Sequence, residues 1–289
     1  MKKKVPVARN VGEAREKALR ELRDGLDVDL LLAHALGLTR EWLYAHPEQV
    51  LTDRERQVFH EYVARRAARE PLAYITGRRE FYGLDLRVDA SVLIPRPATE
   101  CLVERALVWW RENPPAPGPN DPAMIVEAGA GSGAISLALA SELPEATVIA
   151  GEVSVAAARV AHENVQRLDL AGRVYAVIAD LQPPTGPAPR LLVANLPYIP
   201  RAVIDTLEPE VCDHEPRAAL DGGDDGFDLY RRFIDEMRVV PGGAAAIEIG
   251  RDQAALIRAA VSGHDPRLTV EVTPDLEGFD RVALIRGFR

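Results

Sequence analysis

An alternation of apolar runs and amphipathic segments begins at Met124 and constrains the fold more than any other feature of this sequence. Apolar and β-branched runs predict seven strands, at 124–129, 147–153, 174–180, 191–195, 244–250, 268–275 and 281–287. Apolar residues at helical spacing predict helices at 133–143, 156–168, 228–240 and 252–263. Strands that alternate with helices favour a parallel, doubly wound α/β sheet, and the short return between the last two strands allows one antiparallel edge.

The first 70 residues follow a different pattern, because their apolar residues recur at helical spacing without intervening strands. Helices are expected at 11–22, 27–38 and 52–70. Asp27 or Asp29 is expected to cap the second helix, and Thr52 or Asp53 the third, with Glu55 or Glu61 in support. Short helices with short connections predict a small bundle.

The segment between these two regions, residues 72–122, follows a third pattern. Residues 72–95 are rich in β-branched and aromatic residues, with Gly77 and Gly83 as breaks, and predict a hairpin or short strands. Residues 98–112 predict another helix, and the proline-dense segment 113–122 predicts a linker. We therefore divide the chain into a helical domain at 1–73, a β-hairpin connector at 74–92 and an α/β domain at 93–289.

The charge of the chain argues against a stable nucleic-acid partner, because nonspecific affinity for nucleic acids comes mostly from Lys and Arg. The formal net charge is −9. Residues 1–75 hold 14 Lys and Arg against 12 Asp and Glu, and the rest holds 21 against 32, a balance of −11. Two cysteines and six scattered histidines give no metal-ligand spacing, so we expect no metal site. Without a secretory signal or an apolar run long enough to span a membrane, we expect a cytoplasmic protein.

A glycine-rich segment, EAGAGSGA, lies between the first predicted strand and its helix. Its glycines allow a tight turn and close approach to a ligand. The G-x-G-x-G spacing differs from the G-x-G-x-x-G of dinucleotide sites, and the segment lacks the G-K-[ST] of a P-loop. It resembles the S-adenosylmethionine loop of class I methyltransferases, although a plain turn is the alternative. The resemblance predicts cofactor contacts at Glu127, Gly129, Ala130, Gly131, Ser132 and Gly133.

Acidic residues end the next two predicted strands. In this architecture ligands lie beyond the carboxyl ends of the strands. Glu152 can therefore accept hydrogen bonds from both hydroxyl groups of a ribose. Asp180 and Leu181 follow the third strand, at a position that commonly lines the adenine pocket of such enzymes. A solvated surface acid is the alternative for both Glu152 and Asp180.

The fourth predicted strand ends in Asn195, Leu196, Pro197 and Tyr198. Asn195 offers a side-chain carbonyl acceptor, and Tyr198 offers a ring that can stack on a planar group. Pro197 fixes the turn so that nearby main-chain carbonyls point into a pocket. Such a site suits a planar –NH2 group, either an amide or an aromatic amine, whose nitrogen would be oriented toward a sulfonium methyl group. The alternative is a structural turn at the strand exit.

Nearly end to end, the sequence resembles the HemK/PrmC protein-glutamine methyltransferases, which modify peptide chain release factors. The resemblance runs through EPLAYITGRREFYGLDLRVDASVLIPRPATE, GAGSGAISLALA, NLPYIP, EPRAALDGGDDGFDLYRRF and IEIGRDQ. It implies a helical bundle, a β-hairpin and a Rossmann-like class I methyltransferase domain that uses S-adenosyl-L-methionine. The implied substrate is the glutamine of a Gly-Gly-Gln loop, and we expect the enzyme to act as a monomer.

On the cofactor side, the resemblance implies that residues 129–133 hold the methionine part of the cofactor. Glu152 would hold the ribose, and Asp180 and Leu181 would border the adenine. The family usually has Asp where this chain has Glu127 and Glu152. Glutamate keeps the acceptor atoms of aspartate but has a longer reach.

On the substrate side, the resemblance implies that Asn195 contributes its side-chain acceptor and Leu196 its main-chain carbonyl, while Tyr198 packs against the glutamine. The family generally has N-P-P-Y, where this chain has N-L-P-Y. Because N-L-P-Y is also typical of ribosomal RNA adenine dimethyltransferases, an adenine amine methyltransferase is one alternative. Two others are a glutamine methyltransferase that acts on a ribosomal protein and a non-catalytic binding module.

Overall fold

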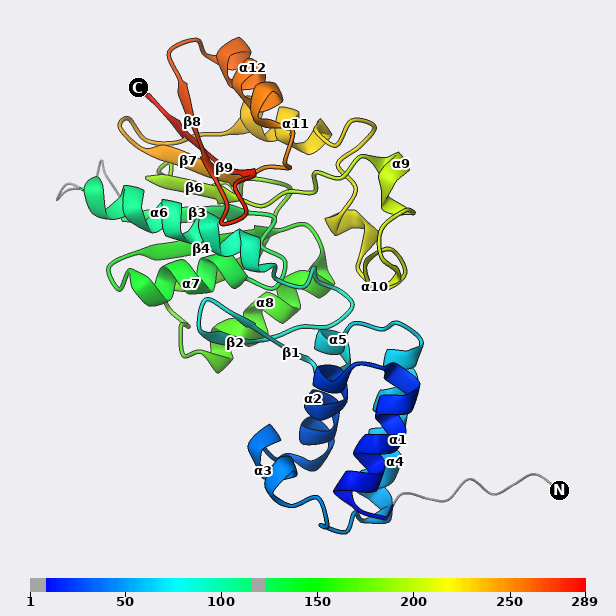
Figure 1. Ribbon diagram of the computed structural model, residues 1–289. Helices are drawn as coiled ribbons and strands as arrows, with labels where there is room; N and C mark the ends of the chain where they lie inside the picture. Colours follow the sequence, from blue (N-terminus) through cyan, green and yellow to red (C-terminus); the bar gives the residue numbers. More distant parts are fainter. Residues whose placement is uncertain (1–8, 116–122) are drawn as a thin grey trace. The chain divides into compact units, whose positions relative to one another are not determined.

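The computed structural model describes residues 9–115 and 123–289, so most of the proposed linker at 113–122 lies outside the described residues. The chain divides into two compact units (Figure 1). The N-terminal unit comprises the residues up to Gly77 together with Glu208–His214. The C-terminal unit comprises Arg78–Leu207 and Glu215–Arg289.

The N-terminal unit is a bundle of short helices, as the sequence predicts. Its helices are α1 (Val11–Leu22), α2 (Gly25–Leu36), α3 (Arg40–Ala45), α4 (Asp53–Ala67), α5 (Leu72–Thr76) and α10 (Pro209–Cys212). Their buried core includes Val28, Leu31, Leu32, Phe59 and Val63. Thr52 caps α4 through a capping box with Glu55, which confirms that expectation.

The cap of α2 differs from the prediction. Asp24 is the N-cap, because its side chain accepts hydrogen bonds from the main-chain N–H groups of Leu26 and Asp27. The prediction that Asp27 or Asp29 caps this helix was therefore wrong. Asp29 is buried and forms an ion pair with Arg15, with 2.6 Å between Oδ1 and Nε.

The connector also differs in its first residues, because α5 occupies positions where strands were predicted. Pro71 precedes this helix, and Gly77 ends it with a φ of +71°. Burial of the middle of α5 overrides the β propensity of its aromatic and β-branched residues. The predicted hairpin follows as β1 (Arg78–Phe81) and β2 (Leu84–Arg87). Positive φ at Tyr82 and Gly83 is what a two-residue type I′ turn requires.

The segment Glu208–His214 belongs to the N-terminal unit although it lies far along the chain. Arg66 forms an ion pair with Glu210 at 2.9 Å. Arg69 lies 3.2 Å from Glu208 and 2.6 Å from Glu210. These ion pairs attach α10 to the end of α4, and the sequence analysis did not predict this helix.

The C-terminal unit is built on a seven-stranded sheet. Its strands are β3 (Met124–Ala128), β4 (Thr147–Glu152), β5 (Val174–Ile178), β6 (Leu191–Ala194), β7 (Ala244–Glu248), β8 (Thr269–Pro274) and β9 (Asp280–Arg286). The order is β5-β4-β3-β6-β7-β9-β8, in which β9 is antiparallel to both neighbours and the other pairs are parallel. All seven predicted strands and the antiparallel edge are confirmed.

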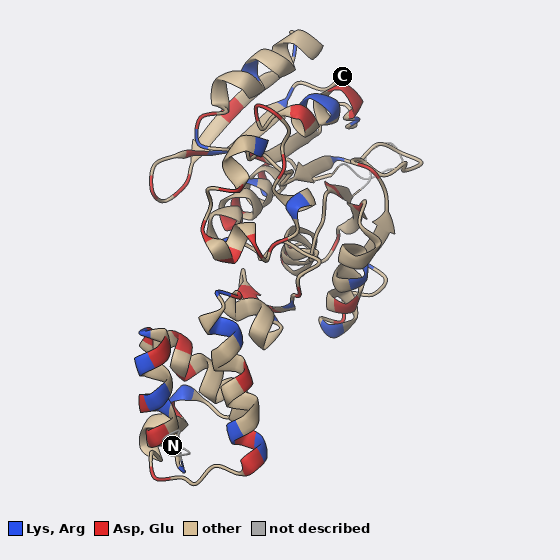
Figure 2. Cartoon of the chain, turned by 90° about the vertical axis from the view of Figure 1, so that its right-hand side faces the viewer, with Lys and Arg blue, Asp and Glu red and all other residues tan. Residues whose placement is uncertain are grey.

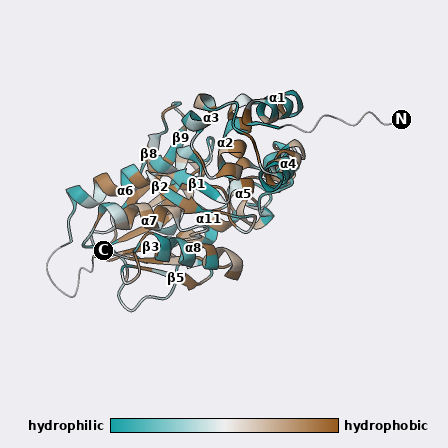
Figure 3. Cartoon of the chain, turned by 90° about the horizontal axis from the view of Figure 1, so that it is seen from below, coloured by the Kyte–Doolittle hydropathy of each residue, from teal (hydrophilic) through white to brown (hydrophobic). Residues whose placement is uncertain are grey.

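Helices cover both faces of this sheet (Figure 1). One face packs against α6 (Glu100–Glu112), α7 (Ala134–Glu142) and α8 (Val155–Arg167), and the other against α11 (Asp228–Glu236) and α12 (Ala254–His264). Ile125 belongs to the first core and Val126 to the second, as the alternation of a strand requires. The ribbon of α6 alternates between hydrophobic and hydrophilic stretches in Figure 3.

Three short helical segments lie in the connections of the C-terminal unit: η1 (Pro97–Thr99), α9 (Arg201–Ile204) and η2 (Arg217–Ala219). Helix α11 ends at Glu236, earlier than the sequence predicts. Among residues 9–115 and 123–289, no helix is both long enough and apolar enough to cross a membrane.

Candidate functional site

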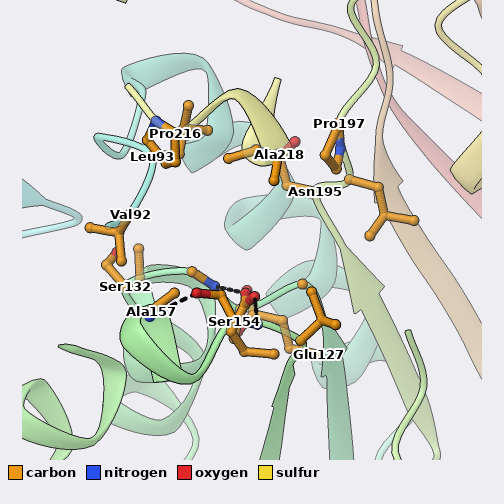
Figure 4. A pocket seen from close by; sticks show the side chains of 18 of the residues that line it. Val92, Leu93, Glu127, Ser132, Ser154, Ala157, Asn195, Pro197, Pro216 and Ala218 are labelled. Carbon is orange, nitrogen blue, oxygen red and sulfur yellow. Dashed lines mark hydrogen bonds between the residues drawn. The ribbon is translucent and has the colours of Figure 1, made fainter. Parts of the chain in front are cut away.

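A cavity of ≈ 210 Å³ lies at the carboxyl ends of β3, β4 and β6, where open α/β sheets bind ligands (Figure 4). Most of the predicted site residues line it: Glu127, Gly129, Ala130, Gly131, Ser132, Glu152, Asp180, Leu181, Asn195, Leu196 and Pro197. Gly133 and Tyr198 are not among the lining residues. Figure 4 shows Asn195 and Pro197 across the cavity from Ser132 and Ser154.

The glycine loop follows β3 and leads into α7. Gly129, Gly131 and Gly133 have φ values of +72°, +55° and +81°, which side-chain-bearing residues rarely adopt. A Cβ atom on Gly129 would also lie 3.1 Å from Cδ2 of Leu196. The buried side chain of Asn164 steadies the loop, because its Nδ2 donates to the Ser132 carbonyl at 3.0 Å. The loop therefore presents main-chain groups to the cavity in a fixed conformation.

Glu152 ends β4 and is nearly buried. Its Oε2 accepts a hydrogen bond from the Gly131 N–H, and its Oε1 accepts one from the Ser154 N–H, both at 2.8 Å. Two main-chain donors thus fix the carboxylate against the glycine loop. A carboxylate offers about four lone-pair sites, so each oxygen can accept a further hydrogen bond from a ligand.

Glu127 also borders the cavity, but its environment differs from that of Glu152. Its Oε2 accepts hydrogen bonds from the main-chain N–H of Ser136, at 2.9 Å, and from the Ser136 hydroxyl. Complete burial, with a smaller contribution from the nearby Glu152 carboxylate, raises the pKa of Glu127 to about 8, although the hydrogen bonds from Ser136 oppose the shift. The carboxyl group is therefore turned toward the first turn of α7.

Asp180 and Leu181 follow β5 and border the cavity, as predicted for residues near an adenine. Asp180 is largely exposed, and its Oδ2 lies 2.8 Å from Nη2 of Arg232 on α11. Leu181 is buried and has a φ of +58°. The apolar Leu181 side chain, rather than the carboxylate of Asp180, is the part of this pair held rigidly at the wall.

Asn195 and Leu196 form the opposite wall. Nδ2 of Asn195 donates to Oγ1 of Thr99 at 3.2 Å, so the other end of the amide, Oδ1, remains an available acceptor. The Leu196 carbonyl is 3.2 Å from the hydroxyl of Tyr230, which lies closer, at 2.5 Å, to the Glu248 carbonyl. A hydroxyl has only one proton, so the Leu196 carbonyl keeps accepting capacity for a ligand.

Tyr198 lies behind this wall rather than on it. Its hydroxyl donates to Oε1 of Glu248 at 3.0 Å, and its ring packs against the core that contains α11 and α12. Burial and the neighbouring Glu248 carboxyl raise the pKa of Tyr198 well above its ordinary value. Packing of this ring against a substrate, which the resemblance implies, stays a prediction.

Two loops close the cavity on a third side, and a part-buried ion pair joins them. Arg96 lies 2.5 Å from Oε1 of Glu215, whose Oε2 accepts a hydrogen bond from the Ile94 N–H at 3.3 Å. Burial raises the pKa of Glu215, and Arg96 opposes that shift. Residues 91–96 and 216–219 of these loops line the cavity at Ser91, Val92, Leu93, Pro95, Arg96, Pro216, Ala218 and Ala219.

The sequence analysis assigned no role to Thr99, Glu215, Tyr230 or Glu248. All four lie in segments that carry the family resemblance, so those segments were the available signal. Among the residues that the structure describes, no group of three or more His, Cys, Asp and Glu side chains is arranged to hold a metal ion.

Comparison with known proteins identifies close relatives of this chain. Residues 13–77 match a family model described as the PrmC N-terminal domain. The chain is 40% identical over 266 residues to a release factor glutamine methyltransferase of Bradyrhizobium diazoefficiens. The aligned residues cover 90% of this chain and 87% of that protein. It is 41% identical over 265 residues to a protein of the same name from Moorella thermoacetica, with 91% of each chain covered.

A solved structure, the hMettl16 catalytic domain in complex with MAT2A 3'UTR hairpin 6, aligns with a TM-score of 0.57. It is 14% identical and covers 83% of this chain and 85% of that chain, so the likeness concerns the fold alone. The seven-stranded mixed sheet is that of a class I, Rossmann-like methyltransferase, here preceded by a helical domain and a hairpin. Because about 40% identity extends over nine tenths of its length, the chain belongs to the HemK/PrmC family of release factor glutamine methyltransferases.

Proposed function

We propose that this protein transfers a methyl group from S-adenosyl-L-methionine to the side-chain amide nitrogen of the glutamine in the Gly-Gly-Gln loop of peptide chain release factors. The name that its relatives carry, release factor glutamine methyltransferase, supports this substrate. One structural observation carries the proposal. Thr99 holds Nδ2 of Asn195 at the cavity wall, which leaves Oδ1 to accept a hydrogen bond from a substrate amide.

The residues at the cavity fit the proposed cofactor. Glu152 keeps accepting capacity for the hydroxyl groups of a ribose, the loop 129–133 lets the methionine part approach the main chain, and Leu181 offers an apolar surface to the adenine. Asp180, next to Leu181 in the chain, also lines the cavity. When bound, S-adenosyl-L-methionine supplies an electrophilic methyl group on a sulfonium.

Asn195 and Leu196 would bind and orient the amide group of the substrate glutamine. Oδ1 of Asn195 and the carbonyl of Leu196 accept hydrogen bonds from the two hydrogens of the glutamine –NH2 group. This arrangement orients a poor nucleophile, and orientation alone can contribute ~7–11 kcal/mol in favourable cases. Both acceptors also stabilise the positive charge that grows on the nitrogen during transfer. Pro197 stiffens the turn that carries them.

The proton that the nitrogen loses has no obvious protein acceptor. Among the described residues that line the cavity there is no His or Lys. Glu127 is turned toward α7 and Glu152 toward the glycine loop. We propose that the proton leaves to water after methyl transfer.

An adenine amine methyltransferase fits the site less well. A flipped base stacks between aromatic or apolar side chains, and the Tyr198 ring, which would supply the aromatic surface, is not among the residues that line the cavity. The net charge of −9 also disfavours a nucleic-acid substrate. A glutamine methyltransferase that acts on a ribosomal protein uses the same chemistry and is separated only by experiment.

We propose that the N-terminal unit docks the protein substrate, and that the enzyme works as a monomer in the cytoplasm. Positively and negatively charged residues are mixed along the helices of this unit (Figure 2). Reversing two exposed charges on α1 and α4, Lys17→Glu and Arg54→Glu, should raise KM for an intact release factor and leave KM for a Gly-Gly-Gln peptide unchanged. Equal effects on both substrates would refute docking through these two residues, and sedimentation velocity would test the monomer.

The proposed function is tested by comparing substrates with one enzyme preparation. Methyl transfer from labelled cofactor would be measured to a release factor, to the same factor with the loop glutamine replaced by glutamate, to ribosomal protein and to an adenine-containing RNA hairpin. We expect transfer to the first substrate only. Preferential labelling of the RNA or of ribosomal protein would replace this proposal with the corresponding alternative.

A further inference from the structure

We propose that Glu248 is a positioning residue for methyl transfer. As a buried carboxylate behind the cavity wall, it acts through Thr99 to fix which end of the Asn195 amide faces the substrate. This inference rests on the proposed function for its kinetic consequence. Its structural content, the orientation of one amide group, can be tested without any substrate.

Glu248 is the last residue of β7 and is 1% exposed. Its Oε1 accepts the hydrogen bond from the Tyr198 hydroxyl at 3.0 Å. Its Oε2 is buried without a close hydrogen-bond partner among the described residues. An unpartnered buried carboxylate oxygen is costly, so its retention calls for an explanation.

Thr99 connects this carboxyl group to the cavity. It is 4% exposed, lies at the end of η1 and contributes to the cavity wall. Its Oγ1 accepts the hydrogen bond from Nδ2 of Asn195. The same hydroxyl is near enough to Glu248 to lower the pKa of its carboxyl group through a hydrogen bond. The Thr99 proton can therefore turn toward the Glu248 carboxyl group.

The direction of these hydrogen bonds follows from the number of protons available. An ionised carboxylate can only accept, and a threonine hydroxyl has one proton to donate. Once Thr99 donates to Glu248, its oxygen can only accept from Asn195. Asn195 must then present its –NH2 end to Thr99 and its carbonyl end to the cavity, which is the orientation that a substrate amide requires.

Burial is the largest influence on Glu248 and raises the pKa of its carboxyl group above the ordinary value. Hydrogen bonds from Thr99 and Tyr198 and the charges of Arg281 and Arg96 oppose that rise and support the ionised form on which the direction of these hydrogen bonds depends. Tyr230 adds a second link, because its hydroxyl donates to the Glu248 main-chain carbonyl and lies 3.2 Å from the Leu196 carbonyl. Side chain and main chain of one residue thus support both proposed substrate acceptors.

The Glu248→Gln variant tests whether Glu248 orients the Asn195 amide or only fills space in the core. Glu248→Gln keeps the shape but can donate as well as accept, so the Thr99 hydroxyl is no longer forced to point away from Asn195. Thr99→Val removes the hydroxyl with little change in volume, and Thr99→Ser restores it. Glu142→Gln, at an exposed ion pair with Arg111, is the control for loss of one negative charge.

Kinetics with a Gly-Gly-Gln peptide give the first readout. Glu248→Gln and Thr99→Val should each lower kcat by ~10–100-fold, by analogy with residues that orient the ligands of a metal site. The cofactor Kd from calorimetry and the KM for cofactor should stay within about 2-fold of the parent values, because the glycine loop and Glu152 are untouched. Thr99→Ser should recover most of the loss, and Glu142→Gln should match the parent.

The double variant tests whether Glu248 acts through Thr99. If it does, Glu248→Gln combined with Thr99→Val should be no slower than the slower single variant, because both remove the same constraint. Multiplied effects would show two independent roles and would overturn the proposed connection.

The second readout needs no turnover. In the 15N-labelled protein, the side-chain –NH2 signals of Asn195, assigned by their loss in Asn195→Ser, should show one protected set. Glu248→Gln and Thr99→Val should shift or double these signals, and Glu142→Gln should not. Unchanged Asn195 signals in both variants would overturn the proposal even if activity fell. An inactive parent enzyme with the expected signal changes would instead refute only the proposed function.

Discussion

The two sides of the cavity are built in different ways. The glycine loop and Glu152 rely on main-chain groups, and two N–H donors hold the single carboxylate in place. The side at Asn195 relies on side chains from η1, α11, β7 and the turn that follows β6. A main-chain loop with fixed φ values is rigid by itself, whereas an amide side chain is fixed only by its partners. We therefore expect substitutions on the first side to change cofactor affinity and substitutions on the second to change turnover.

The largest expected effect is on the substrate side. Asn195→Ala removes an acceptor aimed at the substrate –NH2 group, and kcat/KM should fall by at least ~10²-fold, as for the loss of one preorganised polar contact. The cofactor Kd from calorimetry should change little. Near-normal turnover in this variant would contradict the role given to Asn195, and a matching loss of cofactor affinity would break the division between the two sides.

A smaller effect is expected on the cofactor side. Glu152→Gln replaces one accepting oxygen with an –NH2 group, so either the Gly131 or the Ser154 N–H loses its partner. Leaving a buried donor unpaired costs about 1–3 kcal/mol, which predicts a cofactor Kd at least ~5-fold weaker. The kcat at saturating cofactor should be retained. A variant that binds cofactor normally but turns over slowly would reverse the assignment.

The pH dependence of stability tests the buried environment of Glu127. Burial raises the pKa of Glu127 to about 8, so the folded protein binds a proton that the unfolded chain has released. This contribution to stability is present at low pH and is lost as the pH rises through about 8. The free energy of unfolding should therefore fall by up to ~1.4 kcal/mol per pH unit between pH ~5 and ~8.

Glu127→Gln should remove that slope, because its side chain stays neutral. Urea unfolding at a series of pH values measures the effect, with Glu142→Gln as the exposed control. Parallel curves for the parent and Glu127→Gln would show that the Glu127 carboxyl is ionised in the folded state.

The smallest expected effect concerns Asp180. Its ion pair with Arg232 is exposed, and exposed pairs contribute about 0–1 kcal/mol. Asp180→Asn should therefore change the cofactor Kd by less than ~3-fold and stability by less than ~1 kcal/mol. A loss of cofactor affinity as large as that in Glu152→Gln would show that Asp180, and not only Leu181, contacts the adenine.

The same division between the cofactor side and the substrate side separates what the sequence could predict about the site from what it could not. The glycine loop, Glu152 and Asn195 lie next to strand ends, so the local pattern and the binding of ligands at the carboxyl ends of parallel strands were sufficient to predict that they meet at one cavity. The contacts of Thr99 with Asn195, and of Tyr198 and Tyr230 with Glu248, join residues far apart in the chain. No periodicity indicates which buried polar side chain will meet which other.

The fold shows a similar limit. Alternating apolar runs predicted all seven strands and the antiparallel edge, because each run is long enough to mark a strand. The short helices α5 and α10 were missed, since one turn of helix has too few residues to show a period. Tertiary contacts stabilise both: burial of Ala73, Tyr74 and Ile75 for α5, and ion pairs of Glu208 and Glu210 for α10.

The most direct test of the central claim is to locate the transferred methyl group. An intact release factor would be incubated with enzyme and methyl-deuterated cofactor, and tandem mass spectrometry would be used to sequence the peptide that contains the Gly-Gly-Gln loop. We predict one labelled methyl group on the glutamine side chain with the parent enzyme and almost none with Asn195→Ala in the same time. An unlabelled glutamine with the parent enzyme, or equal labelling by Asn195→Ala, would contradict the account.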